Sequence, residues 1–348
     1  MAERLRRRAG WSPGSGRLAA RLCRAHAARS CRHPLLLGLD TSSILRPEAK
    51  TSADRTYVYQ ANAPTGVTPV APGWSFSGLV VLAQPISSWS YVLDQQRSAS
   101  TSDAVTVGAT QLRAILPLLS VRAILLLDRY YSRVPWILAT AGLPIAQFIR
   151  ARCDQVLDRA APPRTGKWGG PRKDGLRFKG SDSTTHGTPD ATATVPDAHG
   201  RTTQVDVWSG LHLRKAREVA IRVVRITRAA AAGTKRDPRE SWFWWLGETL
   251  PPLEEVAGLY GHRFGQEHGH RVDKQQLVWD APHVRTPAQF ELWMHVVAMV
   301  RNQLVVARTV VTAERRPWET TSRPATPQQV RRALLRSTPQ HARNLGPF

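Results

Sequence analysis

Cysteine is scarce in this sequence, with only three in 348 residues. Cys23, Cys31 and Cys153 have no CxxC spacing and no histidines at zinc-finger intervals. We therefore expect three free thiols in a reducing compartment, and not the disulfide framework of a small secreted protein.

Long apolar runs are also missing. The longest candidate, residues 114–127, is interrupted by Pro117 and Arg122 and falls short of the ~20 residues that cross a bilayer. The Arg-rich N-terminus lacks the apolar core of a secretory signal. Neither of the phosphate-binding patterns GxxxxGK[ST] and GxGxxG is present. We expect a cytoplasmic protein with no membrane segment and no nucleotide cofactor.

Acidic residues are few, with 26 Asp and Glu against 49 Lys and Arg, which gives a net charge of +23. Such a surplus favours a polyanionic partner, because basic side chains that neutralise phosphates release condensed counterions. Only seven of the basic residues are lysines, and the richness in Arg, Ala and Pro also fits a GC-rich coding sequence. Charge therefore favours a nucleic acid partner without proving one.

The first half of the chain alternates between short apolar runs and helical patterns. We predict strands at 35–39, 57–60, 74–82, 88–93, 123–127 and 144–149, and helices at 103–119 and 134–141. Asp103 is the predicted N-cap of the first helix, and Pro72-Gly73 predicts a turn before the strand at 74–82. This order predicts an α/β fold, in which helices flank a mixed sheet.

The pattern then changes, and we divide the chain accordingly. A basic, poorly ordered leader (1–33) precedes the first part of the α/β core (34–153). A β-rich insertion (154–250), with strand-like stretches at 203–208 and 219–226, interrupts that core. Helical periodicity at 253–277 and 286–308 completes it (251–310), and a basic, Pro-rich tail (311–348) is expected to be loose.

Two aspartates stand at the ends of predicted buried strands, Asp40 after residues 35–39 and Asp128 after residues 123–127. Residues just beyond the carboxyl ends of neighbouring parallel strands converge on one crevice. Carboxylates gathered there can bind Mg²⁺, which prefers oxygen ligands. The alternative is that each aspartate only forms a turn, as Asp commonly does.

A third carboxylate, Glu267, lies in the predicted helix at 253–277. At ~100° per residue, Tyr260, Arg263, Glu267 and Lys274 fall within roughly 60° of one another. The stripe would combine a metal ligand with two phosphate-binding cations. The alternative is that Arg263 and Glu267, four residues apart, form an ordinary surface ion pair.

Two further groups of residues have competing interpretations. His262, His268 and His270 lack the HExxH order of a zinc site, so we do not expect zinc. The segment Ser241–Trp245 (SWFWW) fits a buried core strand, although exposed aromatics could instead stack on unpaired bases.

The spacing Tyr260-x2-Arg263-x3-Glu267-x6-Lys274 resembles the Tyr-Arg-Glu-Lys motif of a large group of bacterial insertion-sequence DDE transposases. The segments GLDTS around Asp40 and LLLDRYYS around Asp128 are similar to the first and second catalytic regions of that group. The resemblance runs from about Leu35 to Arg308. It implies a ribonuclease H-like catalytic core, interrupted by a β-rich insertion before the Glu-bearing helix.

The resemblance also implies roles for individual residues. Asp40, Asp128 and Glu267 would bind two Mg²⁺ ions, for which Mn²⁺ could substitute, and would catalyse cleavage and transfer of DNA strands. Tyr260, Arg263 and Lys274 would contact phosphates near the scissile bond, and Arg150 and Arg152 are weaker candidates for the same role. The partner would be double-stranded DNA, both element ends and target, bound by a homodimer in the bacterial nucleoid.

The sequence departs from this family in two ways. Only 39 residues precede Asp40, where relatives usually have a longer region that recognises the element ends, and the chain also stops early, at Phe348. Two other functions therefore stay open. The chain could be a truncated or domesticated remnant that acts only as a nuclease, or a basic DNA-binding protein without catalysis.

Overall fold

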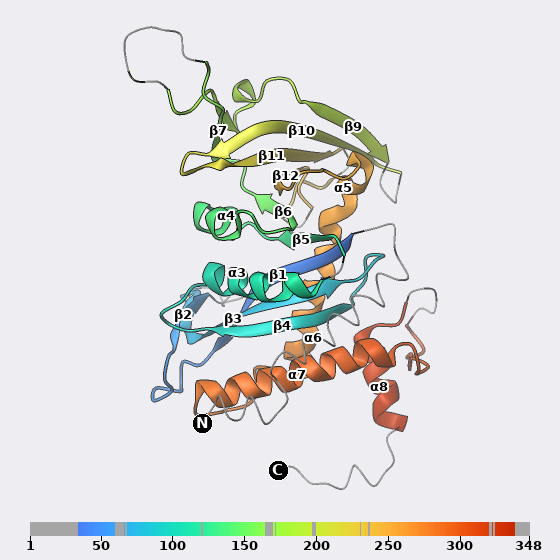
Figure 1. The fold of residues 1–348 in the computed structure, drawn as a ribbon. Helices are drawn as coiled ribbons and strands as arrows, with labels where there is room; N and C mark the ends of the chain where they lie inside the picture. The colour runs from blue at the N-terminus through green and yellow to red at the C-terminus, as the bar shows by residue number, and fades with distance from the viewer. Residues whose placement is uncertain are drawn as a thin grey trace. The chain divides into compact units, whose positions relative to one another are not determined.

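Figure 1 shows the computed structural model of the chain. The structure describes residues 34–59, 66, 68–119, 121–163, 170, 172–196, 200–229, 231–235, 237–319, 322 and 324–337. The expected leader, Cys23 and Cys31 lie outside these residues. The chain forms two compact units. Among the described residues, unit 1 comprises Gly38–Val107 and the chain from His262 onward, and unit 2 comprises Gly108–Gly261 and the residues up to Leu37.

Unit 1 is built on strands around β3. Its elements are most of β1 (Leu35–Leu45), then β2 (Thr56–Tyr59), β3 (Val70–Leu82), β4 (Ser90–Ser98), α6 (Phe264–Gln275), α7 (Pro287–Ala307) and α8 (Pro327–Ser337). Strand β3 neighbours β1 and pairs antiparallel with both β2 and β4. Helix α3 (Ala104–Ile115), continued by the 3-10 turn η1 (Leu116–Leu118), begins in unit 1 and ends in unit 2.

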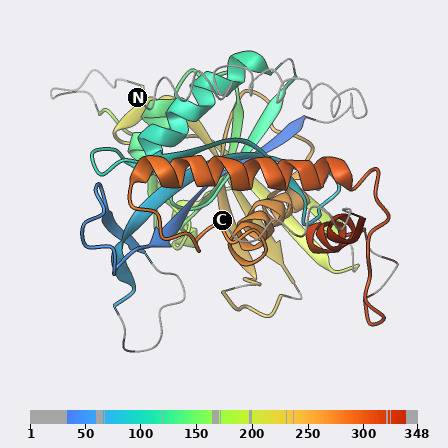
Figure 2. The same cartoon turned by 90° about the horizontal axis from the view of Figure 1, so that it is seen from below.

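The core of unit 1 lies between the strands and α7. Helix α7 packs along β4 and is the long orange helix that crosses Figure 2. Phe290 on α7 contacts the rings of Trp74 and Phe76 on β3, with ring centroids 5.3 and 5.4 Å apart. Burial of such large rings contributes most of the hydrophobic stabilisation of a core.

Helix α7 begins with a capping box at Thr286, the residue at which the helix was predicted to start. Gln289 N donates to Thr286 Oγ1 at 3.2 Å, and the Gln289 side chain accepts from Thr286 N. The same arrangement begins α8, where Thr326 and Gln329 bond reciprocally. The expectation of a loose tail is therefore wrong for Pro327–Ser337. The Pro- and Arg-rich composition suggested a loose segment, but Thr326 and Gln329 provide the N-terminal cap of a helix. The fully buried Val330 packs this helix against the core.

The turn predicted at Pro72-Gly73 is also wrong, because β3 runs through both residues. Pro72 and Gly73 pair with Tyr57 and Thr56 of β2. On the other side, Gly73 lies so close to Ile44 that an added Cβ would collide with the Ile44 carbonyl oxygen. Glycine in a strand often marks such a close backbone approach.

Unit 2 is richer in strands. Its elements are β5 (Ala123–Leu127), α4 (Val134–Thr140), β6 (Ala146–Ala151), β7 (Val156–Arg159), β8 (Arg177–Lys179), η2 (Ser183–Thr185), β9 (Ala191–Pro196), β10 (Thr202–Leu213), β11 (Ala216–Arg228), β12 (Glu240–Leu246) and α5 (Leu253–Leu259). Strands β5 and β6 pair in parallel. The order then continues through β12, β11 and β10 in antiparallel pairs, and β7 and β9 both pair with β10.

The aromatic segment Ser241–Trp245 forms most of β12 and is core. Its four aromatic side chains are at most 5% exposed. Phe243 stacks on Phe148 of β6 with ring centroids 4.5 Å apart, and Trp242 stacks on Trp208 of β10 at 5.9 Å. The core interpretation of this segment is confirmed.

Other local predictions hold as well. Asp103 caps α3, because its Oδ1 accepts from Thr106 N at 2.8 Å. The predicted strand at 123–127 is β5, and the predicted helix at 134–141 is α4. Cys153 is an exposed free thiol.

In the part of the chain that the structure describes, we find no helix with the length and apolar character of a transmembrane span.

The close approach at Gly73 can be tested by substitution. Gly73→Ala should lower the free energy of unfolding by about 1–3 kcal/mol, because the strands must separate to admit the methyl group. The control is Gly258→Ala in α5, where nothing lies within 4 Å of the added Cβ. It should stabilise by up to about 1 kcal/mol through helix propensity. Urea denaturation measures both, and equal effects would contradict the packing argument.

Candidate active site

Asp40 lies inside β1, not at its end. The expectation that the strand stops at Asp40 is wrong, because β1 continues to Leu45 through Thr41, Ser42 and Ser43. Short hydroxyl side chains in an extended segment do not prevent pairing once both neighbouring backbones are in place. The Asp40 side chain is 16% exposed, and its Oδ1 accepts from Thr41 N at 2.9 Å.

Arg263 connects Asp40 with Glu267. Its Nη2 lies 2.7 Å from Asp40 Oδ2, and its Nη1 lies 3.1 Å from Glu267 Oε1. The Arg263 side chain is 7% exposed and the Glu267 side chain 59%. The pair predicted from the four-residue spacing exists, but it is not the ordinary surface ion pair of the alternative interpretation. Two carboxylates from segments far apart in sequence bind one buried cation.

The helix predicted at 253–277 is interrupted, which corrects the predicted stripe. Helix α5 ends at Leu259, a 3-10 turn η3 covers Tyr260–Arg263, and α6 begins at Phe264. Glycines at 258, 261 and 265 weaken helix propensity before, within and after the turn. His262 anchors η3 to the residue that follows β3, because its Nδ1 donates to Ala83 O at 2.9 Å.

Lys274 lies on α6 but makes its own contacts. Its Nζ donates to Ser43 O at 3.0 Å, near the end of β1, and lies 5.7 Å from the centre of the Trp279 ring. Burial lowers the pKa of this ammonium, which Asp280 and Asp273 partly oppose. Lys274 thus ties α6 to the strand that contains Asp40.

Asp128 follows β5 directly, as predicted. Its Oδ1 accepts from Tyr130 N at 2.9 Å, and its backbone oxygen accepts from Tyr131 N at 3.2 Å. Asp128 therefore also forms the turn that the alternative interpretation describes. The turn is buttressed by the ring of Tyr131, which meets that of Trp136 edge-on with ring centroids 4.7 Å apart.

The remaining predicted residues of unit 2 lie near the end of β6. Leu127 and Ile149 are the last registered pair of β5 and β6, so Asp128 and Arg150 both follow that pair on neighbouring strands. The Arg150 guanidinium lies 5.7 Å from the centre of the Tyr260 ring, which packs on Phe243. Arg152 instead points to solvent and pairs with Asp154.

The unit 1 carboxylates suit a hard divalent cation. Asp40 and Glu267 offer only oxygen donors, and both already direct an oxygen to one cationic group. In the part of the chain that the structure describes, no three His, Cys, Asp or Glu side chains form a ready-made metal cluster. The two carboxylates fit a metal, then, as part of a set that needs further ligands from protein, water or substrate.

The sequence analysis did not single out the residues that seat α6. The buried face of this helix includes Gln266 and Asp273, which are 0% and 2% exposed. His270 is also enclosed, with its ring stacked toward Trp279 at 6.3 Å. Burial, reinforced by Arg301, Lys274 and Arg263, lowers the pKa of His270 to about 3. Gln266, His270 and Asp273 recur at helical spacing, and this spacing was the sequence signal that they share one buried face of the helix.

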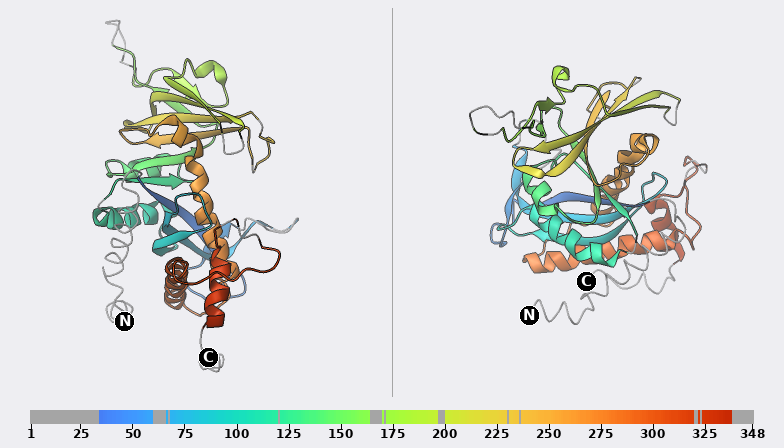
Figure 3. Two further views of the ribbon diagram at one scale, coloured as in Figure 1. Left: turned by 90° about the vertical axis from the view of Figure 1, so that its right-hand side faces the viewer. Right: turned by 45° about the horizontal axis from the view of Figure 1, so that its top comes forward.

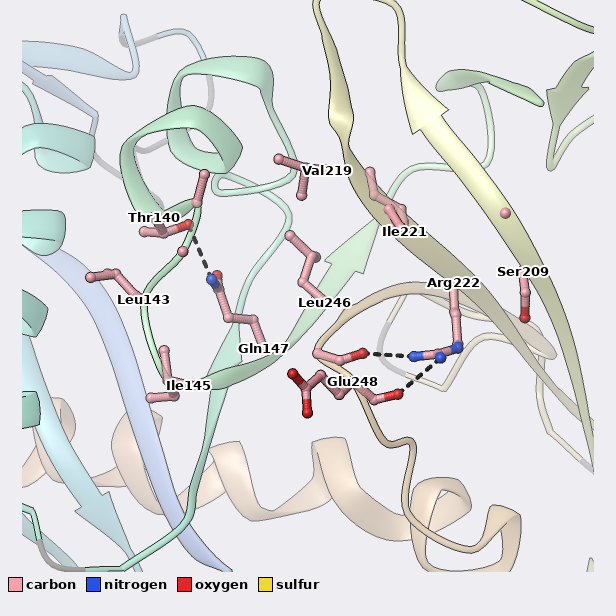
Figure 4. Close-up of a pocket in the computed structure, with 15 residues that line it drawn as sticks. Thr140, Leu143, Ile145, Gln147, Ser209, Val219, Ile221, Arg222, Leu246 and Glu248 are labelled. Atoms are coloured by element: carbon pink, nitrogen blue, oxygen red, sulfur yellow. Dashed lines mark hydrogen bonds between the residues drawn. The ribbon is translucent and has the colours of Figure 1, made fainter. Parts of the chain in front are cut away.

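Unit 2 also has a cavity of about 420 Å³, shown in Figure 4. Two of its polar side chains are already bonded: Gln147 bonds to Thr140 and Trp136, and Arg222 donates to the carbonyls of Gly247 and Glu248. The predicted catalytic residues do not line it. The cavity therefore offers no link to the carboxylate chemistry.

Residues 2–214 match the family described as DDE superfamily endonuclease. This span contains Asp40 and Asp128 and ends before Glu267. Strands in mixed orientation with flanking helices fit the ribonuclease H-like fold of such enzymes. Comparison with curated proteins finds no match.

The Arg263 contacts generate a stability prediction. Arg263→Ala should lower the free energy of unfolding by about 3 kcal/mol in EDTA, because it leaves Asp40 mostly buried without its cation. Adding Mn²⁺ should recover part of the loss. The control Arg152→Ala removes an exposed Arg–Asp pair and should change nothing measurable. Similar losses in both variants would show that Arg263 has no special electrostatic role.

His270 should make the protein sensitive to acid. The unfolded histidine protonates below about pH 6.5, whereas the folded one stays neutral until about pH 3. Between these values the unfolded chain binds more protons, so stability falls as the pH drops. From pH 6.5 to 5 the loss should be about 2 kcal/mol. His270→Phe keeps an aromatic ring and should reduce the pH dependence by that amount in urea titrations; an unchanged dependence would rule out His270 as its source.

Proposed function

The chain belongs to the DDE superfamily endonucleases, and from this premise we propose that it is a transposase that cleaves DNA strands and transfers an insertion element. The catalytic carboxylates of the proposal are Asp40, Asp128 and Glu267. The Tyr-Arg-Glu-Lys spacing supports a place in the bacterial insertion-sequence group that carries this motif.

The observation that carries the proposal is the meeting of Asp40 and Glu267 at Arg263. Glu267 lies outside the residues that match the family, so its assignment rests on the motif and on this contact. A fold does not need to bring two carboxylates from β1 and α6 to one buried guanidinium for stability alone, because apolar contacts would cost less. The resemblance, and not the geometry, assigns Asp128 to the same ions.

The proposal divides the residues into metal ligands and DNA contacts. Asp40, Asp128 and Glu267 supply oxygen ligands for two Mg²⁺ or Mn²⁺ ions. Ions held by these carboxylates would supply the Lewis acidity that activates a water or 3′-hydroxyl nucleophile and stabilises the leaving oxygen. Arg263 is next to both unit 1 carboxylates, so its guanidinium is within reach of a phosphate brought to them. Tyr260, Lys274, Arg150 and Arg152 are proposed to contact the DNA backbone.

Two further parts of the proposal concern organisation. Residues 154–250, which contain β7–β12, are proposed as an insertion into the ribonuclease H-like core. A homodimer on DNA, associated with the bacterial nucleoid, is proposed because two element ends must be processed together. The net charge of +23 supports strong, salt-dependent binding to DNA.

Cleavage of DNA that carries the flanks of the gene tests the proposal. Wild type should nick this DNA only with Mg²⁺ or Mn²⁺. Asp40→Asn, Asp128→Asn and Glu267→Gln should each reduce the rate by about a hundredfold or more, since each removes metal-ligand charge, while DNA binding by gel shift persists. Glu255→Gln, an exposed glutamate on α5, is the control that should cleave normally.

The outcomes separate the competing functions. Cleavage without joining of a 3′-end to target DNA would identify a nuclease. Binding without cleavage by every protein, wild type included, would identify a DNA-binding remnant. Full metal-dependent cleavage by Glu267→Gln would remove that residue from the site.

A further inference from the structure

Helix α6 has an unusual buried face. Of its buried residues, Gly265, Gln266, Gly269, Val272 and Asp273, only Val272 has a sizeable apolar side chain. Hydrophobic burial therefore contributes little to the docking of this helix. Its position in unit 1 depends on hydrogen bonds and close backbone contacts.

Those contacts reach three strands of unit 1. Gln266 Nε2 donates to Gly78 O on β3 at 3.0 Å, and Ser90 Oγ on β4 donates to Gly265 O at 2.8 Å. Gln266 also lies against Gly38 of β1, where an added Cβ would collide with its Oε1. The side chain of Gln266 thus fills the space between the backbone of α6 and β1, the strand that contains Asp40.

A buried ion pair completes the contacts from the side of α7. Arg301 Nη1 donates to Asp273 Oδ2 at 2.7 Å, and Arg301 Nη2 donates to Ser90 Oγ. Arg301 and Asp273 are 5% and 2% exposed. Gly269 leaves the room for the guanidinium, because a Cβ there would collide with it. We call Ser90, Gln266, Asp273 and Arg301 the α6 anchor. Figure 3 shows α6 beside the strands of unit 1 with α7 and α8 next to it.

Directional bonds specify a helix position more strictly than apolar packing does. A rotation of α6 by one residue turns it by ~100° and would break every bond of the anchor at once. Each buried polar group would then lose its partner, which is costly. An apolar face, by contrast, tolerates small slips because its contacts are not directional.

Through Gln266, the anchor is next to Glu267 in sequence and contacts β1 close to Asp40. Gln266 precedes Glu267, and Gly38 is two residues before Asp40. We propose that Arg301 and Asp273, with Ser90 and Gln266, are positioning residues that fix the direction of Glu267 relative to Asp40 and so set metal affinity. This inference rests on the proposed function of Glu267.

The decisive variant replaces the ion pair by apolar side chains of similar size, Asp273→Leu with Arg301→Met. Such exchanges often preserve or increase stability, because two buried charges no longer need desolvation. We expect a folded protein whose unfolding midpoint is at or above that of wild type. Mn²⁺ affinity, measured on the DNA-free protein by water-proton relaxation, should fall about tenfold, as for other residues that orient metal ligands. The metal-dependent cleavage rate should fall by a similar factor.

A matched control separates position from general stability. Arg97 on β4 and Glu291 on α7 also form an ion pair, 2.9 Å apart, and Arg97 bonds Asp54 as well, so this pair joins β4 to α7 through residues that lie outside α6. Arg97→Met with Glu291→Leu should leave Mn²⁺ affinity unchanged.

The conservative variant Arg301→Lys keeps the charge but cannot bond Asp273 and Ser90 in the same forked geometry. Its Mn²⁺ affinity should therefore lie between that of wild type and that of the Asp273→Leu/Arg301→Met variant.

The results discriminate between the two proposals. Wild-type Mn²⁺ affinity in the folded Asp273→Leu/Arg301→Met variant would overturn the positioning role. Wild-type affinity and cleavage in Glu267→Gln would instead overturn the assignment of Glu267. If the double variant does not fold, Ser90→Ala decides: it removes one acceptor of Arg301 and the donor to Gly265, so unchanged Mn²⁺ affinity would overturn the proposal and reduced affinity would support it.

Discussion

A cation shared by two carboxylates is the interaction on which unit 1 depends. Two carboxylates that are brought close together repel each other, and the repulsion grows as water is excluded. Asp40 and Glu267 converge only because the Arg263 guanidinium lies between them and offsets that repulsion. A metal ion would meet the same requirement, so the arrangement that orients the two carboxylates in the fold also suits the proposed metal site.

The polar face of α6 follows from this constraint. A helix that must direct a carboxylate at one point needs a fixed rotation, and hydrogen bonds from β3, β4 and α7 provide it. The apolar core of unit 1 lies elsewhere, between the aromatic residues of β3 and α7. Stability and precision are thus supplied by different layers of the same unit.

The sequence predicted what depends on short stretches of chain. Asp128 was placed correctly because the five preceding residues are apolar and form one buried strand, and the Arg263–Glu267 pair follows from helical spacing. The length of β1 was not predictable, because partners from β3 extend it through a Ser/Thr-rich segment. The contact of Arg263 with Asp40 joins residues more than 200 positions apart, and nothing in either local sequence specifies it. Glycines at 258, 261 and 265 indicate the break after α5. The prediction missed it because the helical spacing of the other residues continues across the break.

The order of segments along the chain has a consequence for synthesis. Unit 1 is assembled from residues before Gly108 and after Gly261, with most of unit 2 between them. At about 5–20 residues per second, a ribosome needs roughly 11–45 s to reach Arg263 after it has added Asp40. During that time β1 carries its aspartate without the cation that pairs with it. The carboxylate pair can form only after unit 2 has been made, so assembly of this part of the protein is timed by translation.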